Sequence, residues 1–295
     1  MPRVALLTAR QYREVDEDLA PLAEALPAAG LEAHICCWDE AQDWSAFDLL
    51  LLRSTWDYMS RQAEFLAWAE RASRAAPLAN PLDTVRWNID KHYLGALAGA
   101  GVPVIPTVFL EPGDDAALAI ERFLAGNDCA EFVLKPAVGV GSIDAQRHAR
   151  AARATALAHA SRLLDAGRSA LLQPYLARVD AEGESALVFF GGEFSHSIRK
   201  AALLRAGSGA AGSTIAPETI HARTASADEL AVARQALAGI PAGVPLYARV
   251  DLLRDAAGQS RVLELELIEP SLFFAHAAGA AARFASCIAR FLGRC

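Results

Sequence analysis

Acidic and basic side chains alternate along two neighbouring β-rich segments near the end of the sequence. Residues 247–253 and 261–268 are rich in aliphatic and β-branched side chains, and the turn sequence 255–258 between them predicts a hairpin. Side chains alternate between the two faces of a strand, so charged residues two positions apart share a face. The pairs that share a face are Arg249 with Asp251 and Glu264 with Glu266.

If the hairpin brings these faces together, three carboxylates and one guanidinium crowd into one place. Carboxylates that close repel one another unless a cation lies among them, and oxygen ligands suit Mg²⁺ beside phosphates. The two strands together therefore predict a metal site at Asp251, Glu264 and Glu266. The alternative is a half-exposed hairpin with an acidic polar face, which would be favoured for either strand alone.

A second polar cluster follows a run of four leucines at residues 49–52. Capping of the next helix by Asp57 or Ser60 would explain only one residue of this cluster. Ligands of a parallel sheet bind beyond the carboxyl ends of its strands, so we expect the cluster to bind substrate, with Arg53 holding a carboxylate. Its residues are Arg53, Ser54, Thr55, Trp56, Asp57 and Tyr58.

The elements expected to position the second cluster form an α/β unit at residues 1–87. Strands and helices alternate there, which predicts a parallel sheet. The Asn80-Pro81 turn signal is a plausible domain boundary. The expected strands are 3–8, 31–38 and 48–53, and the expected helices are 15–29 and 61–75.

Two lysines and a small-residue loop follow this unit. Lys91 is expected to open a helix that ends near Gly99, and Lys135 ends a predicted strand at 131–136. In the loop 137–142, small residues would let backbone N–H groups approach phosphate oxygens closely. A two-glycine loop is more often a plain turn, and this one lacks the GKS or GKT of a P-loop.

Further elements are expected along the rest of the chain. Pro174 interrupts a strand at 170–176 and suits a hinge, and Gly191-Gly192 indicates a hairpin within 182–200. The Gly-, Ala- and Ser-rich loop 205–214 is a candidate lid, and a final helix is expected at 280–292.

Composition excludes several classes of protein. With 53% hydrophobic and 21% charged residues, the sequence is that of a globular protein, and its net charge of −7 argues against a nucleic-acid-binding face. The five cysteines lack metal-site spacing, and no apolar run is long enough to cross a membrane. Without a signal-peptide pattern at the start, we expect a cytoplasmic protein with no membrane partner.

The order of these polar residues resembles the ATP-grasp superfamily, in its glutathione-synthetase-like branch, from Lys91 to about Phe274. The motifs at 53–58, 173–175 and 265–271 look like the subgroup that contains the O-ureido-serine cyclase of the cycloserine pathway. The resemblance implies an α/β fold in which two lobes clasp ATP after an N-terminal parallel α/β domain. It divides the chain into a substrate domain at 1–87, a central lobe at 88–175 and a C-terminal lobe at 176–295.

The resemblance also implies roles for individual residues. Lys91 and Lys135 would reach ATP phosphates, and Arg249 with the neighbouring Arg199-Lys200 pair would surround the transferring group. Asp251, Glu264 and Glu266 would hold Mg²⁺, although Glu266 stands where the family has asparagine and Gln173 where an acid is common. The remaining implied residues are Val138, Gly139, Gly141 and Ser142 in the phosphate-covering loop, Gln173, Tyr175 and Leu176 at the adenine hinge, Glu184 near the ribose, and Glu269 and Ser271 facing substrate.

The implied reaction is ATP-dependent carboxylate ligation through an acyl phosphate on an amino-acid-like small molecule. An amine or similar nucleophile then displaces phosphate, either from a second molecule or, in a cyclo-ligase of antibiotic biosynthesis, from the same one. A non-catalytic ATP sensor and a small-molecule kinase are the alternatives. The sequence leaves a homodimer open.

Overall fold

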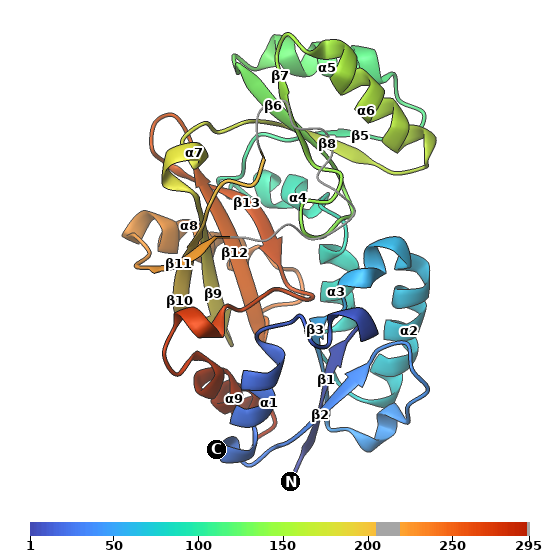
Figure 1. The fold of residues 1–295 in the computed structure, drawn as a ribbon, viewed down its shortest axis with the longest axis vertical. Coiled ribbons are helices and arrows are strands. Elements are labelled where there is room, and N and C mark those ends of the chain that lie inside the picture. The colour runs from blue at the N-terminus through green and yellow to red at the C-terminus, as the bar shows by residue number, and fades with distance from the viewer. Residues whose placement is uncertain (205–218, 294–295) are drawn as a thin grey trace.

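The computed structural model describes residues 1–204 and 219–293. Its strands form three sheets, which contain four, five and four strands (Figure 1). The loop at 205–214, predicted to be a lid, lies outside the described residues. Among the residues described, no helix is both long and apolar enough to cross a membrane.

The first sheet is parallel, as predicted, with the strand order β2-β1-β3-β4. Both of its faces are buried, which explains the nearly continuous leucines of its central strands. Its elements are β1 (Arg3–Thr8), α1 (Leu19–Ala25), β2 (Glu32–Cys37), β3 (Leu49–Ser54), the short helix η4 (Trp56–Ser60), α2 (Gln62–Ala75) and β4 (Leu78–Ala79).

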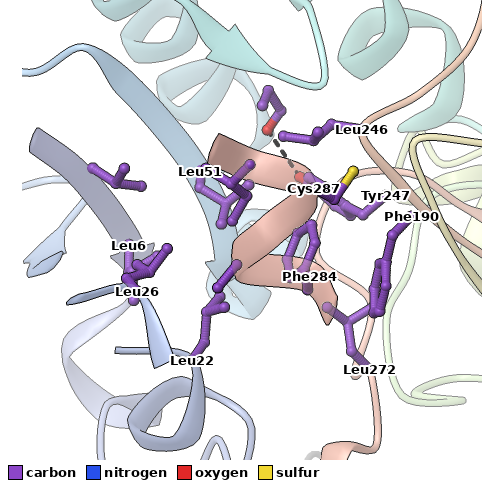
Figure 2. Close-up of a cluster of buried hydrophobic side chains, with 14 of the residues drawn as sticks. Leu6, Leu22, Leu26, Leu51, Phe190, Leu246, Tyr247, Leu272, Phe284 and Cys287 are labelled. Carbon is purple, nitrogen blue, oxygen red and sulfur yellow. Dashed lines mark hydrogen bonds between the residues drawn. The ribbon is translucent and has the colours of Figure 1, made fainter. Parts of the chain in front are cut away.

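Different helices cover the two faces of this sheet. Leu50 and Leu52 pack with α2, whereas Leu6 and Leu51 pack with α1 and with the last helix, α9 (Ala280–Phe291) (Figure 2). The helix predicted at 15–29 is shorter than expected, because α1 covers only Leu19–Ala25. The sheet therefore needs residues from the far end of the chain to bury its second face.

The central sheet is antiparallel, with the order β5-β8-β6-β7, in which β5 is an edge strand. Helices α5 and α6 pack on it around Phe123 and Phe132 (Figure 1). Its elements are β5 (Val108–Leu110), α5 (Ala116–Gly126), β6 (Glu131–Pro136), β7 (Gln146–Ala149), α6 (Arg153–Asp165) and β8 (Ala170–Pro174).

The third sheet is also antiparallel and has the order β11-β10-β9-β12-β13. Gly191 and Gly192 join β9 to β10 with φ angles of 57° and 80°, so the predicted two-glycine hairpin is confirmed. Its elements are α7 (Val179–Glu182), β9 (Glu184–Phe190), β10 (Glu193–Lys200), β11 (Ile220–Arg223), α8 (Ala227–Ala238), β12 (Tyr247–Arg254) and β13 (Ser260–Glu266).

Helices α3 (Leu82–Asn88) and α4 (Tyr93–Gly99) cover the open edge of β13. The Asn88 amide donates to the Leu265 carbonyl at 2.7 Å and accepts from the Leu267 N–H at 2.9 Å, so buried backbone groups at this edge are satisfied. Lys91 lies in the turn between the two helices, so the prediction that it opens a helix is wrong.

Candidate active site

A pocket opens where the central sheet faces the β12–β13 hairpin, and the N-terminal domain closes one end of it. The predicted site residues that line it are Trp56, Tyr58, Lys91, Lys135, Gly139, Gly141, Ser142, Gln173, Tyr175, Leu176, Glu184, Lys200, Arg249, Asp251, Glu264, Glu266, Glu269 and Ser271. Most of the predicted polar residues therefore meet in one place, drawn from the central and third sheets, the short helix η4 and the loops between these elements.

The floor of the pocket is the β12–β13 hairpin. Arg249 lies opposite Glu266, and Asp251 lies opposite Glu264, so the four charged side chains share one face as predicted. On the other face, Val250 and Leu265 are buried in the core. The alternation of apolar and charged residues therefore anchors one face of the hairpin and presents the other to the pocket.

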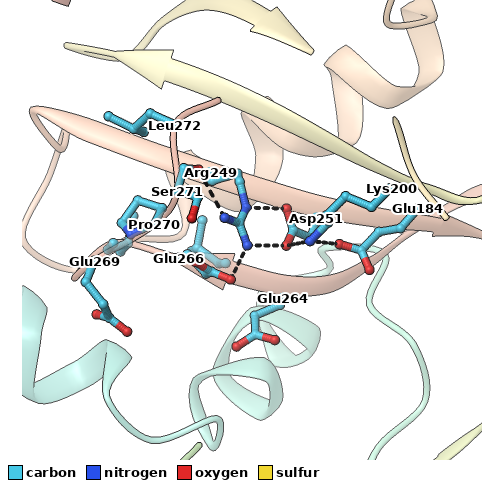
Figure 3. Close-up of polar contacts among 12 residues, drawn as sticks. Glu184, Lys200, Arg249, Asp251, Glu264, Glu266, Glu269, Pro270, Ser271 and Leu272 are labelled. Carbon is cyan, nitrogen blue, oxygen red and sulfur yellow. Dashed lines mark hydrogen bonds and ion pairs between the residues drawn. The ribbon is translucent and has the colours of Figure 1, made fainter. Parts of the chain in front are cut away.

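Arg249 is the centre of the ionic network on this floor (Figure 3). Its guanidinium donates to both carboxylate oxygens of Asp251 at 2.9 Å, to the Ser271 carbonyl at 3.0 Å and to Glu266. Lys200 pairs with Asp251 at 2.9 Å and also with Glu184. Burial alone would raise the pKa of Asp251, but Arg249 and Lys200 hold that pKa below its usual range.

The two glutamates of β13 differ in their protonation. Burial acts to raise the pKa of both, but Lys91, 3.0 Å from Glu264, and Lys135 hold the Glu264 pKa below its usual value. The pKa of Glu266 is raised to about 7 by burial and by the neighbouring charges of Asp251 and Glu264, against the opposing effect of Arg249. Burial and the neighbouring carboxylates therefore favour the protonated, neutral form of Glu266.

These carboxylates provide the hard oxygen donors that Mg²⁺ prefers. Their pairing with arginine and lysine keeps them apart, and within residues 1–204 and 219–293 no three acidic, His or Cys side chains converge closely enough to hold a metal ion. Binding a metal would therefore require these side chains to exchange their present ion pairs for the metal. The donor set fits a divalent cation, whose charge would favour the ionised form of Glu266.

The opposite wall carries the two predicted lysines and the small-residue loop. The Lys91 ammonium donates to the Gly139 carbonyl at 2.9 Å, which ties it to the loop. Lys135 has no ion-pair partner among the residues described, and burial together with the nearby charge of Lys91 lowers its pKa despite the carboxylates around it. Val138 is the exception in the loop, because it packs against the core of the N-terminal domain instead of lining the pocket.

The predicted hinge forms one end of the pocket. Gln173 donates to the Thr107 hydroxyl at 2.9 Å. The Tyr175 ring lies 3.6 Å from the guanidinium carbon of Arg147, a residue that the sequence analysis did not single out. Arg147 also pairs with Glu131 and Asp180 and so fixes this end of the pocket.

Arg199 does not line the pocket, contrary to its predicted role. Adjacent residues of a strand point to opposite faces, and on β10 it is Lys200 that faces the pocket. The Arg199 guanidinium donates to the Ala181 carbonyl at 2.5 Å. The prediction that both residues surround the transferring group is therefore wrong for Arg199.

Comparison with known proteins identifies the family. Residues 4–80 match the N-terminal domain family of D-cycloserine synthetase DcsG. Along 299 aligned residues, the chain is 43% identical to the cycloserine biosynthesis protein DcsG of Streptomyces lavendulae, and the match covers 98% of each chain. The chain belongs to the D-cycloserine synthetase family. The crystal structure of D-cycloserine synthetase DcsG superimposes with a TM-score of 0.92 at 42% identity, covering 98% of this chain and 99% of that one.

More distant structures share the fold alone. The ATP-grasp ligase PsnB, in complex with a precursor variant, Mg and ADP, has a TM-score of 0.65 at 17% identity and 99% coverage of both chains. D-alanine–D-alanine ligase from Bacillus anthracis has a TM-score of 0.71 at 15% identity, covering 100% of this chain and 98% of that one. The predictions of an ATP-grasp fold, of the cycloserine subgroup and of an ATP-dependent ligase are confirmed.

In this D-cycloserine synthetase family member, four of the six residues at 53–58 lie outside the pocket lining. The Arg53 side chain is 1% exposed and donates to the Pro270 carbonyl at 2.8 Å, so it is not placed to grip a substrate carboxylate. The Ser54 hydroxyl pairs with that of Thr8 at 2.7 Å, and Asp57 accepts from Trp38 at 2.9 Å. Thr55 is fully buried.

The residues at 53–58 act instead on the segment 269–274, which we call the substrate-side segment. Trp56 donates from its indole N–H to the Glu269 carbonyl at 2.9 Å, and the Tyr58 hydroxyl donates to the Glu269 carboxylate at 2.8 Å. Together with Arg53, they hold the first two residues of the segment against the N-terminal domain. Trp56, Tyr58, Glu269 and Ser271 line the pocket.

Asp18 is a positioning residue that the sequence analysis missed. Its carboxylate accepts the backbone N–H groups of Leu272, Phe273 and Phe274 at 2.5, 2.9 and 2.8 Å. In the sequence it belongs to the acidic run Asp16-Glu17-Asp18, which is typical of an exposed turn. Only its burial, at 4% exposure, distinguishes it from Glu17.

Proposed function

We propose that the chain uses ATP and Mg²⁺ to close the ring of D-cycloserine from O-ureido-D-serine. The observation that carries this proposal is a single pocket in which cations and carboxylates lie between the hinge and the substrate-side segment. The 43% identity to the cycloserine biosynthesis protein DcsG supports the choice of substrate. Ring closure makes the ligation intramolecular.

The pocket supports a division of roles along its length. The adenine ring would lie at Gln173, Tyr175 and Leu176, with the ribose near Glu184. Lys91, Lys135 and the loop residues Gly139, Gly141 and Ser142 would neutralise and cover the phosphates. Mg²⁺ held by Asp251, Glu264 and Glu266 would supply charge neutralisation of the phosphate oxygens.

The chain's own residues supply the remaining chemistry. Lys200 and Arg249 would stabilise the charge that develops on the γ-phosphoryl group as the substrate carboxylate attacks it. The nitrogen bonded to the side-chain oxygen of the same molecule then displaces phosphate from the acyl phosphate and closes the ring. Water must then remove the carbamoyl group from that nitrogen, as carbon dioxide and ammonia, to leave cycloserine. No protein nucleophile is required, because both reacting groups belong to the substrate.

The proposal is tested by measuring ADP release and cycloserine formation with O-ureido-D-serine. Equal amounts of ADP and cycloserine are expected, and ADP release without cycloserine would contradict ring closure. Hydroxylamine should trap the acyl phosphate as a hydroxamate. A kinase that phosphorylates a hydroxyl group would give ADP and a stable phosphate ester without hydroxamate.

The assembly and location of the chain stay predictions. The net charge of −7 supports the expected absence of a nucleic-acid partner. A homodimer is checked by sedimentation at several protein concentrations, and a cytoplasmic location by fractionation of the producing cells.

A further inference from the structure

Glu269 is a buried carboxyl group with one unused oxygen on the wall of the pocket. The residue is 8% exposed, its Oε1 accepts from Tyr58 at 2.8 Å, and its Oε2 has no hydrogen-bond partner. No arginine, lysine or histidine among the residues described forms an ion pair with it. A buried carboxylate without a cation is costly, so its placement beside a pocket calls for a ligand group that compensates it.

The surroundings of Glu269 are rigid. The Tyr58 ring stacks on Phe65 with 5.0 Å between ring centroids, and the Trp56 ring meets Tyr12 edge-on at 5.2 Å. The Glu269 backbone is fixed through its carbonyl by Trp56. The free oxygen is therefore held in place by the protein and cannot turn away to solvent without breaking these contacts.

The charges around Glu269 favour a cationic ligand. Glu266 and Glu264 are acidic neighbours of Glu269, and Lys91 is a basic neighbour. The Tyr58 hydroxyl donates to its carboxylate, Tyr247 lies close to both Glu269 and Arg53, and Arg53 binds the next residue, Pro270. Burial, Glu266 and Glu264 raise the Glu269 pKa to about 8, against the opposing effects of Tyr58 and Lys91. A ligand ammonium group would reverse this shift and release a proton on binding.

The segment that carries Glu269 also binds the cation of the pocket floor. Two residues further along the same segment, the Ser271 carbonyl accepts from Arg249, the cation at the centre of the pocket floor. An α-amino acid carries its ammonium and its reacting carboxylate on one carbon atom. One short segment therefore carries an acidic group on the wall of the pocket and also binds the cation of the pocket floor (Figure 3).

We propose that Glu269 and Tyr58 form the subsite for the α-ammonium group of the substrate, with the Trp56 ring as its aromatic wall. This inference rests on the proposed function. The subsite makes the enzyme specific for amino acids over the corresponding acids that lack the amine. The Glu269 carboxylate takes no part in phosphoryl transfer or ring closure.

The test measures the KM of wild type and of Glu269→Gln for two substrates. O-ureido-D-serine carries the amine, and 3-(ureidooxy)propanoic acid lacks it but keeps every reacting atom. Glu269→Gln should raise KM about 10- to 100-fold for the amine substrate, because a charge-assisted hydrogen bond is lost, and should leave the KM for ATP unchanged. With the substrate that lacks the amine, wild type and variant should have equal KM values.

Two further measurements sharpen the comparison. Tyr58→Phe keeps the carboxylate and should give a smaller rise in KM for the amine substrate alone. Calorimetry in buffers of different ionisation enthalpy should detect proton release when wild type binds the amine substrate, and Glu269→Gln should abolish it. The exposed Glu193 provides a control, since Glu193→Gln should match wild type in both measurements.

Equal losses of Glu269→Gln on both substrates would overturn the subsite, because the carboxylate would then act on a group other than the amine. If wild type releases no ADP with O-ureido-D-serine, the proposed function fails separately. Binding of D-serine and 3-hydroxypropanoate then decides on the subsite. Wild type must prefer D-serine and Glu269→Gln must not, or the inference is wrong.

Discussion

Each charged residue of the pocket floor forms an ion pair with another charged residue of the protein. Glu264 accepts from Lys91 at 3.0 Å, and Asp251 is held by Arg249 and Lys200. On binding, phosphate groups would replace the carboxylates as partners of the lysines, and a divalent cation would replace the lysines and arginine as the partner of the carboxylates. Each charged side chain would therefore have a partner of opposite charge both before and after binding. The present ion pairs keep the side chains close to where the ligands need them.

Replacing Glu264 with glutamine separates a metal role from a structural one. Glu264→Gln should lower kcat at least 100-fold and raise the Mg²⁺ concentration needed for half-maximal rate, because a charged oxygen ligand is lost. Steady-state kinetics at varied Mg²⁺ measure both effects. The melting temperature without nucleotide should change little, and the exposed Glu121→Gln serves as control. Normal turnover in Glu264→Gln would refute the metal assignment.

Arg53 should matter through the segment that it holds. Arg53→Ala removes a buried donor to Pro270, so the free energy of unfolding should fall by about 3 kcal/mol even without substrate. Denaturant titration measures this loss. The KM for the amino acid should rise while that for ATP does not, and Arg10→Ala, at an exposed site, should do neither. Unchanged stability with a raised KM would instead indicate direct contact with substrate.

The residues that sequence reasoning placed correctly are those for which strand alternation decides. Arg249, Asp251 and Glu264 follow from the period of two along a hairpin, and the structure brings their side chains to one face. Alternation also shows that Arg199 and Lys200, which are adjacent on β10, point to opposite faces. The resemblance in motif order nevertheless assigned both residues to the site. Arg53 and Asp18 could not be predicted, because their partners lie 217 and 254 positions away in the sequence.

At the scale of elements, the substrate-side segment has no regular hydrogen bonding of its own over most of its length. Asp18 on the N-terminal side, His196 of β10 and Arg249 of β12 each bind its backbone. The segment therefore takes its shape from both the first and the third sheet. Any movement of one sheet relative to the other would therefore change the positions of Glu269 and Ser271.

Replacing Asp18 with asparagine should loosen this segment. The new side chain would keep one acceptor oxygen, while its amide group would face backbone N–H donors. Asp18→Asn should lower the free energy of unfolding by about 2 kcal/mol and raise the KM for the amino acid. Denaturant titration and kinetics test this, with the exposed neighbour Glu17→Gln as control. Equal behaviour of the two variants would contradict the role of Asp18.

A buried histidine pair joins β7 to α6 in the central lobe. His148 and His159 lie 3.3 Å apart, nitrogen to nitrogen, and burial lowers the pKa of both, that of His159 to about 4. The unfolded chain binds protons at about pH 6.5, so the folded state is fully stable above that pH and loses stability as pH falls towards 4.

The expected loss from His159 is about 2 kcal/mol between pH 7 and pH 5. His159→Leu should remove this part of the pH dependence, because leucine has no proton to bind. Denaturant titrations at several pH values compare the two proteins, and groups common to both cancel in the difference. Parallel stability curves for wild type and variant would show that His159 binds protons equally in the folded and unfolded states, which would contradict this prediction.

At the scale of the whole molecule, the N-terminal and C-terminal parts share one hydrophobic core. Phe284 of α9 is fully buried, stacks on Phe190 at 4.5 Å and meets Tyr247 edge-on at 5.8 Å (Figure 2). The same cluster contains Leu6 and Leu51 of the first sheet. The sequence predicted the sheet and the last helix separately, but amphipathic patterns do not specify which faces meet.

Phe284→Ala should therefore weaken both parts together. The loss of a buried aromatic ring should lower the free energy of unfolding by about 4 kcal/mol, in a single transition followed by fluorescence and circular dichroism. Phe291 lies on the same helix and is 56% exposed, so the control variant Phe291→Ala should change the free energy of unfolding little. Two separate transitions in the Phe284 variant would contradict a shared core.

The contact between α9 and the first sheet has a consequence for synthesis on the ribosome. Strands β1 and β3 leave the ribosome first, whereas the helix that covers one of their faces is made after every other described element. The leucines of that face therefore stay exposed to solvent until α9 has been translated. Nascent chains that stall before Phe284 carry an uncovered apolar sheet, which makes them substrates for chaperones and prone to aggregation.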